Sequence, residues 1–224
     1  MHLKSRQEQS HIILLHNKKT LKTSIRSIII VALLFSGSSL KSQEKYQPGY
    51  IVTNNGDTIR GMICDRKQAP FAQLYSKIRF KGNSLFKRKY SPSQITGYKL
   101  GATSFESEWI NSTSNLFRTN YICDPASGTR HFLKVIVKGY LTYYQWEYMD
   151  QESWSIDAID LFKRENDEYY IRVTRGIFGI RLKNLKEYFM DCPALIQEIE
   201  RGELKTPAEI AYFYNNWIKC KRNK

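Results

Sequence analysis

Residues 131–148, HFLKVIVKGYLTYYQWEY, decide the fold that the sequence predicts. Leu133, Val135 and Val137 share one side of an extended strand and are all apolar, because side chains alternate along a strand. The opposite side mixes apolar residues with lysines. A glycine then precedes a second β-rich run, residues 141–148, which contains several Tyr and one Trp. Two such arms around a short glycine turn are typical of a β-hairpin. Because one face is wholly apolar, we expect this hairpin to lie in the middle of a sheet.

Alternation of polar and apolar residues predicts further strands on both sides of this hairpin. An Asn-Gly pair at positions 55–56 lies between two β-rich runs and marks a hairpin, because both residues tolerate positive φ. Residues 111–115 are polar and predict a loop. The predicted strands cover residues 50–53, 58–64, 76–81, 85–90, 95–100, 103–110, 117–123, 155–164 and 168–174.

The spacing of apolar residues becomes helical after residue 181. Pro193 in a first turn and Gly202 at an end indicate a second helix. Thr206 and Glu209 frame a capping box with proline at the first helical position, which predicts a third. Strands followed by helices indicate an α+β fold. We therefore predict an antiparallel β-sheet, rolled or barrel-like, of about eight or more strands, followed by two or three C-terminal helices.

Residues 1–42 have the three parts of a secretory signal peptide. Basic residues precede an apolar core, residues 28–35 (IIIVALLF), and small residues follow it. Spanning a bilayer takes about 20 apolar residues, so this core is too short for a membrane anchor. We predict cleavage after Ser39 or Ser42, which leaves no transmembrane span in the mature chain. The segment before the core is unusually long. The alternative is that translation starts at a non-Met codon nearer the core, because no other Met occurs before Met62.

The mature chain, residues 43–224, is predicted to be one domain with a β-rich part, residues 43–180, and a helical part, residues 181–224. It holds 28 basic and 20 acidic residues, a net charge of +8. This moderate positive charge favours anionic neighbours, but it does not predict nucleic-acid binding. All 15 Tyr and all four Trp lie in the mature chain, which argues against disorder.

The four cysteines all follow the predicted signal peptide. An even number of cysteines in an exported protein permits disulfide bonds. Cys192 and Cys220 bracket the helical part and are the favoured pair, and Cys64 with Cys123 is the remaining pair. The alternative for each of them is a buried free thiol.

Several segments, taken in order, resemble a family of uncharacterised exported proteins of Bacteroidetes bacteria. They are GYIVTNNGDTIRGMI (49–63), YSPSQITGYKL (90–100) before SFES (104–107), FLKVIVKG (132–139), DCPAL (191–195) and YNNWIKC (214–220). Members of that family open with a GYIVTxxGDTIxG hairpin, and some carry this module ahead of an outer-membrane β-barrel. This chain ends after the helical part, so the resemblance implies no such barrel here. It implies a Gram-negative envelope location, adds support for a Cys192–Cys220 pair, and brings no activity with it.

Catalytic and metal-binding motifs are scarce in the mature chain. Its single histidine is His131, which stands at the start of a predicted strand and is best interpreted as an ordinary loop-edge residue. The cysteine spacing contains no C-x-x-C pair, so no zinc site and no cofactor are predicted. Asp57 invites a metal or sugar contact, but its NNGDT context is also what a tight turn requires.

Two other sets of residues remain as candidates. Paired carboxylates of the kind that glycosidases use would come from Glu106, Glu108, Asp157 and Asp160, although nothing in the sequence singles out a pair. Residues 77–90 (KIRFKGNSLFKRKY) interleave cations with aromatic residues, as strand-based nucleic-acid binders do. For an exported protein, the available polyanions are instead lipopolysaccharide, acidic glycans or phospholipid headgroups. A charged, solvated sheet face is the simpler interpretation of that stretch.

The sequence therefore favours an exported, non-catalytic binding or structural module of the bacterial cell envelope. The alternative is an envelope hydrolase that acts on glycan or peptide through carboxylates. The expected location is the periplasm, the outer membrane surface or the medium of a Gram-negative bacterium. The expected partners are another envelope protein or an anionic glycan or lipid headgroup.

Overall fold

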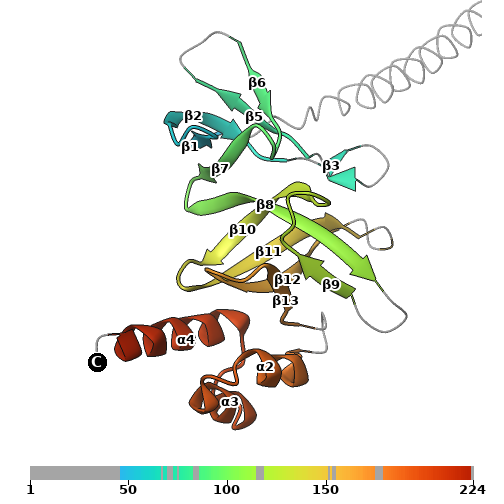
Figure 1. The fold of residues 1–224 in the computed structure, drawn as a ribbon. Helices are drawn as coiled ribbons and strands as arrows, with labels where there is room; N and C mark the ends of the chain where they lie inside the picture. Colours follow the sequence, from blue (N-terminus) through green and yellow to red (C-terminus); the bar gives the residue numbers. More distant parts are fainter. Residues whose placement is uncertain are drawn as a thin grey trace, which may run out of the picture. The chain divides into compact units, whose positions relative to one another are not determined.

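Two long strands, β10 (Thr129–Val137) and β11 (Leu141–Met149), form the predicted central hairpin in the computed structural model of the chain (Figure 1). The structure describes residues 46–66, 68–69, 73–74, 76–82, 86–114, 119–150, 152, 155–174 and 179–222. All of them belong to one unit of the chain, Lys45–Lys224. The predicted signal peptide lies outside the described residues.

Strands dominate the described part of the chain. The remaining strands are β1 (Gln47–Thr53), β2 (Thr58–Cys64), β3 (Gln68–Ala69), β4 (Gln73–Leu74), β5 (Ile78–Lys81), β6 (Arg88–Tyr90), β7 (Ile95–Leu100), β8 (Thr103–Ser114), β9 (Thr119–Ile122), β12 (Ile156–Arg164) and β13 (Tyr169–Arg172). Three helices follow: α2 (Leu182–Tyr188), α3 (Pro193–Glu200) and α4 (Pro207–Arg222). The predicted α+β class and its order of elements are confirmed.

Six strands close into an antiparallel barrel. Their order is β8, β10, β11, β12, β13 and β9, and β9 pairs back onto β8. The barrel interior is filled by side chains that include Leu133, Tyr144, Leu161 and Tyr170. A barrel of this kind has a packed core and leaves few free strand edges.

The sheet continues beyond the barrel through β7, β1, β2, β5 and β6, which we call the sheet extension. The first part of β8 pairs with both β7 and β10, so the extension and the barrel share this strand. One face of the extension is apolar and packs Ile51, Ile63, Phe80 and Tyr98 into a separate core cluster. The predicted Asn-Gly hairpin joins β1 to β2, with Gly56 at φ +89°.

The helices cover apolar side chains of the central hairpin and its neighbours. Leu141 and Phe162 from the barrel strands pack with Leu185, Leu195 and other helix residues in a third core cluster. The predicted capping box opens α4, since Glu209 accepts hydrogen bonds from the backbone N–H groups of Lys205 (2.8 Å) and Thr206 (2.9 Å). These two bonds lower the pKa of Glu209.

Asn215 on α4 connects the helix to the turn of the central hairpin by two hydrogen bonds. Its side chain accepts a hydrogen bond from the Leu141 N–H (2.8 Å) and donates one to the Leu141 carbonyl (2.9 Å). A Cβ atom at Gly139 would lie 2.4 Å from the Asn215 amide, so the turn needs glycine for this close approach. The glycine that predicts the turn thus also makes room for the helix.

Residues 111–114 differ from the prediction. They were expected to form a loop, but they continue β8 and pair with β9 from Asn111 to Ser114. Their side chains are mostly exposed, so no apolar alternation marks them as a strand. Within the described residues, no helix is long and apolar enough to cross a membrane.

Candidate ligand-binding pocket

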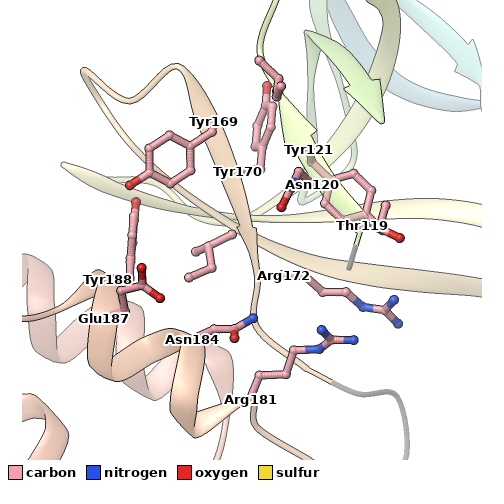
Figure 2. A pocket seen from close by; sticks show the side chains of 12 residues that line it. Thr119, Asn120, Tyr121, Tyr169, Tyr170, Arg172, Arg181, Asn184, Glu187 and Tyr188 are labelled. Carbon is pink, nitrogen blue, oxygen red and sulfur yellow. The ribbon is translucent and has the colours of Figure 1, made fainter. Parts of the chain in front are cut away.

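A pocket of about 370 Å³ lies where β9 and β13 meet helix α2 (Figure 2). Its volume falls in the range of about 300–1,000 Å³ that is usual for small-molecule sites. It is lined by Thr119, Asn120, Tyr121 and Ile122 of β9, Tyr169, Tyr170, Ile171 and Arg172 of β13, and Arg181, Asn184, Glu187 and Tyr188.

Strand alternation gives the pocket its aromatic and apolar wall. Tyr170 lies opposite Tyr121 on β9, and both side chains are buried in the barrel. The neighbouring pair, Tyr169 and Ile122, therefore faces the other way, and both side chains are partly exposed. Tyr169 is 49 % exposed, and its ring meets the ring of Tyr188 edge to face at 6.1 Å. One wall of the pocket thus offers an accessible aromatic surface.

Two arginines, Arg172 and Arg181, lie at one end of the pocket (Figure 2). The Arg181 Nε atom donates to the Thr174 carbonyl at 3.0 Å. The Nε atom of Arg172 is buried and has no partner. No residue in the described ranges accepts a hydrogen bond from Arg172 or forms an ion pair with it.

Arg172 differs in this respect from the other arginines whose Nε atom is buried without a partner. Each of these three places a terminal nitrogen on a protein oxygen. Arg66 donates to the Phe132 carbonyl, Arg130 to the Ser107 carbonyl, and Arg164 to the Tyr188 carbonyl and Asp191. Arg172 is thus a cation at the end of a pocket whose donors find no acceptor among the described residues, which favours an anion there.

Three further polar side chains line the pocket. Asn184 and Glu187 project from α2, and Asn120 projects from β9. Among the described residues, none of these three side chains takes part in a hydrogen bond or an ion pair. Tyr188 differs, because its hydroxyl donates to Asp167 and accepts from the Arg164 backbone N–H. It therefore serves as a fixed part of the wall.

The candidate carboxylates accept hydrogen bonds from tyrosine hydroxyl groups. Seven tyrosines in the described part of the chain donate to a carboxylate: Tyr98 to Asp65, Tyr143 to Asp160, Tyr144 to Glu106, Tyr148 to Asp157, Tyr170 to Glu108, Tyr188 to Asp167 and Tyr214 to Asp191. The four candidate carboxylates named from the sequence, Glu106, Glu108, Asp157 and Asp160, all belong to this set. Burial, with a further effect of the charge of Glu108, raises the pKa of both Tyr144 and Tyr170.

Glu106 and Glu108 are the two candidate carboxylates that the fold brings into one cluster. Both are on β8, and Lys138 pairs with Glu106 at 2.7 Å while Lys163 pairs with Glu108 at 3.2 Å. Each of these two carboxylates therefore has both a lysine and a tyrosine hydroxyl as partners. The arrangement suits a structural polar cluster better than a pair of carboxylates that reaches a substrate.

His131 lies on β10 with its ring packed against Trp146, at a centroid distance of 4.9 Å. Burial, with a smaller effect of the charge of Arg66, lowers the pKa of His131. In the described part of the protein, neither a carboxylate nor a nucleophile hydrogen-bonds this ring. It is a packed histidine on a strand rather than the loop-edge residue that the sequence suggests.

Asp57 belongs to the turn between β1 and β2. Its backbone N–H donates to the Thr53 hydroxyl at 3.2 Å, and its carbonyl accepts from the Thr53 N–H at 2.9 Å. These bonds, together with Gly56 at φ +89°, close the turn through the backbone of Asp57. Among the residues that the structure describes, no group of three or more His, Cys, Asp or Glu side chains is arranged to hold a metal ion.

The four cysteines are free thiols in this structure. Cys192 is buried in the core beneath the helices, whereas Cys220 is exposed near the end of α4, so the favoured pair is not bonded. Cys64 is buried and Cys123 is partly buried, and they are not bonded either. Flanking the helical part in sequence does not bring two thiols together. Either disulfide stays a prediction for the oxidised protein.

Sequence reasoning did not single out the pocket residues. Arg172, Asn120 and Asn184 come from three elements that only the folded sheet brings together. The chain was also compared with known proteins, and no family model, curated protein or solved structure matches it.

Proposed function

We propose that this protein is an exported, non-catalytic binding module of the bacterial cell envelope. In this proposal, the pocket between β9, β13 and α2 binds an acidic sugar, either free or as part of an envelope glycan. The observation that carries the proposal is the guanidinium group of Arg172, which lies at the end of this pocket without an acceptor among the described residues.

The ligand class follows from the groups that line the pocket. A carboxylate or sulfate oxygen would accept hydrogen bonds from Arg172 and Arg181. The exposed ring of Tyr169, which strand alternation places on the other face of β13 from Arg172, offers a flat surface for a further sugar ring of a glycan. Amide groups of Asn120 and Asn184 can both donate to and accept from hydroxyl groups. Glu187 would oppose an anion with several charges, which favours a ligand with one acidic group.

Support for a non-catalytic role comes from the state of the candidate catalytic groups. Glu106, Glu108, Asp157 and Asp160 each accept a tyrosine hydroxyl, and His131 packs on Trp146. A hydrolase needs a carboxylate or a base that can reach substrate and exchange a proton. The alternative function, an envelope hydrolase, has less support than binding.

Support for export comes from the sequence, in particular the basic segment and short apolar core before residue 42. The resemblance to exported Bacteroidetes proteins points the same way. In an oxidising envelope, Cys192 and Cys220 are the pair that we still propose to test for a disulfide. N-terminal sequencing of protein recovered from the envelope should begin after residue 39 or 42, and Ile30→Arg should prevent export.

The binding proposal is tested by thermal melting of residues 45–224 with glucuronate, glucose and sulfate. Glucuronate should raise the melting temperature more than glucose or sulfate does, because only it has both a ring and a carboxylate. Arg172→Gln should weaken binding on the order of 10- to 100-fold, the value of a charged hydrogen bond. Lys183→Gln on the exposed surface of α2 is the matched control and should leave binding unchanged.

Two outcomes would contradict the proposal. One is equal stabilisation by glucose and glucuronate, since the arginines would then have no role. The other is hydrolysis of envelope glycan or peptide by the wild-type protein that is lost in Glu106→Gln or Glu108→Gln, which would establish the alternative.

A further inference from the structure

One face of the sheet extension is strongly cationic, and it lies apart from the pocket. Arg60 shares a face of β2 with Met62, because alternate residues of a strand point to the same side. Directly opposite residues of neighbouring strands also share a face. Met62 pairs with Lys81 on β5, and Tyr50, the partner of Arg60, pairs with Lys99 on β7.

The same rule extends this face to the edge of the sheet. Cys64 pairs with Arg79, which in turn pairs with Lys89 on β6. The cationic face therefore carries five basic side chains: Arg60, Arg79, Lys81, Lys89 and Lys99. Among its described positions on β1, β2, β5, β6 and β7 there is no Asp or Glu.

The sequence of this region has the same bias. Residues 66–105 contain nine basic residues and no acidic one. Residues 46–100 hold ten basic and two acidic residues, whereas residues 101–222 hold 16 basic and 17 acidic residues. Almost the whole net charge of the mature chain is thus concentrated in the sheet extension, where it creates a positive field toward one side.

The cationic face also has a recess, with one exposed apolar group on the face and another in the adjoining connection from β5 to β6. Ser76, Lys77, Arg79 and Lys89 line a pocket of about 240 Å³. Met62 is 37 % exposed between the cations, and Phe86, in the connection from β5 to β6, is 78 % exposed. Apolar side chains of this kind can enter the headgroup region of a bilayer.

We propose that the cationic face docks on a membrane that contains anionic phospholipids. Lipid phosphates would occupy the recess beside Lys77 and Lys89, while Met62 and Phe86 enter the interface. Electrostatic attraction and shallow apolar insertion together are the usual basis of peripheral membrane binding. The inference does not rest on the proposed function, because the face shares no residue with the sugar pocket.

Sedimentation of residues 45–224 with vesicles tests the proposal. This unit contains every described strand, helix and core cluster, so it carries its own core without residues 1–44. The vesicles are phosphatidylcholine alone or mixed with phosphatidylglycerol. The protein should bind only the anionic vesicles, and binding should weaken as salt is raised to physiological ionic strength.

The key variant is the triple substitution Arg60→Gln, Lys81→Gln and Lys89→Gln, because these three cations are exposed. Each cation near an anionic surface contributes roughly a five-fold factor, so the triple should bind on the order of 100-fold more weakly. The matched control, Lys183→Gln, Lys205→Gln and Lys219→Gln, removes the same charge from exposed positions on α2, before α4 and on α4. It should lose less than about five-fold. Equal melting temperatures of both variants would show that folding is intact.

Three results would overturn the proposal. The first is equal binding to neutral and anionic vesicles, and the second is an equal loss in the two triple variants. The third is binding to a soluble polyanion such as heparin without binding to vesicles, which would make an acidic polysaccharide the occupant. Arg172→Gln should leave vesicle binding unchanged, so a failure here and a failure of the sugar pocket are distinguishable.

Discussion

The barrel with its helices differs from the sheet extension in its balance of acidic and basic residues. In residues 101–222 the acidic and basic residues nearly balance, whereas residues 46–100 hold ten basic residues against two acidic ones. Several carboxylates of the barrel and helices accept tyrosine hydroxyl groups or pair with cations, as Asp191 does with both Tyr214 and Arg164. Most of this charge therefore stabilises the fold, with Arg172 as the exception, whereas Arg60, Lys81 and Lys89 of the extension are exposed and accessible to a partner.

Arg66 shows what a paired cation looks like in this protein. It lies at the end of β2, donates to Glu147 of β11 and the Phe132 carbonyl, and stacks over the ring of Phe105 at 5.1 Å. It thereby fastens the extension to the barrel. Arg172 has no comparable contacts in the described residues. The contrast suggests that an unpaired cation here marks a binding site, and the following predictions test it.

The largest expected effect lies at the junction of barrel and helices. Asn215→Ala should lower the free energy of unfolding by about 2 to 5 kcal/mol, because the N–H and carbonyl of Leu141 would lose their partners in a buried site. Asn216→Ala, at the exposed neighbouring position, should change it by less than about 0.5 kcal/mol. Urea unfolding measures both, and similar losses would contradict the role of Asn215.

The next effect concerns the tyrosine–carboxylate bonds. Tyr170→Phe should cost about 1.5 to 3 kcal/mol, because it removes a buried hydrogen bond of 2.8 Å to the charged Glu108. Tyr169→Phe, one residue earlier and half exposed, should have almost no effect on stability. If both substitutions were neutral in urea unfolding, the carboxylates of the barrel would not be structural.

A smaller effect should appear in the pH dependence of stability. The pKa of His131 is lowered from 6.5 in the folded protein, so the unfolded chain binds more protons. The resulting stability is present above the pKa of unfolded histidine and is lost as pH falls from there toward the folded pKa. The difference in unfolding free energy between wild type and His131→Gln should therefore shrink as pH is lowered below 6.5. A difference that is constant with pH would contradict a shifted His131.

The smallest expected effect is in the extension itself. Removing Arg60, Lys81 and Lys89 together should change the free energy of unfolding by less than about 0.5 kcal/mol, because these exposed side chains have no role in packing. A loss of several kcal/mol in urea would mean that these cations support the fold, against the comparison drawn above.

Much of the fold was predictable because its signals are local. The central hairpin, the Asn-Gly turn and the capping box at Thr206 each depend on residues a few positions apart. Closure of the barrel was not specified by local signals, because it depends on β13 pairing with β9, and these two strands are far apart in the chain. Residues 111–114 were missed as a strand since their exposed polar side chains carry no apolar alternation.

The candidate site was less predictable than the fold. Carboxylates such as Glu108 stand out in a sequence, yet only the fold shows that Tyr170 and Lys163 occupy it. Arg172 looks like an ordinary strand cation in the sequence, and only the fold shows that no described residue accepts a hydrogen bond from it. The basic stretch at residues 77–90 was visible, but the sheet register was needed to place Arg60 and Lys99 on its face.

The most direct test of the central claim is the affinity for glucuronate of wild type, Arg172→Gln and Arg130→Gln, measured by titration calorimetry. Arg130 is the matched control, because its terminal nitrogen already donates to the Ser107 carbonyl at 3.2 Å. The claim that an unpaired cation marks the binding site predicts weaker binding in Arg172→Gln alone, with Arg130→Gln like wild type. Equal affinities in all three proteins, or a loss only in Arg130→Gln, would contradict it.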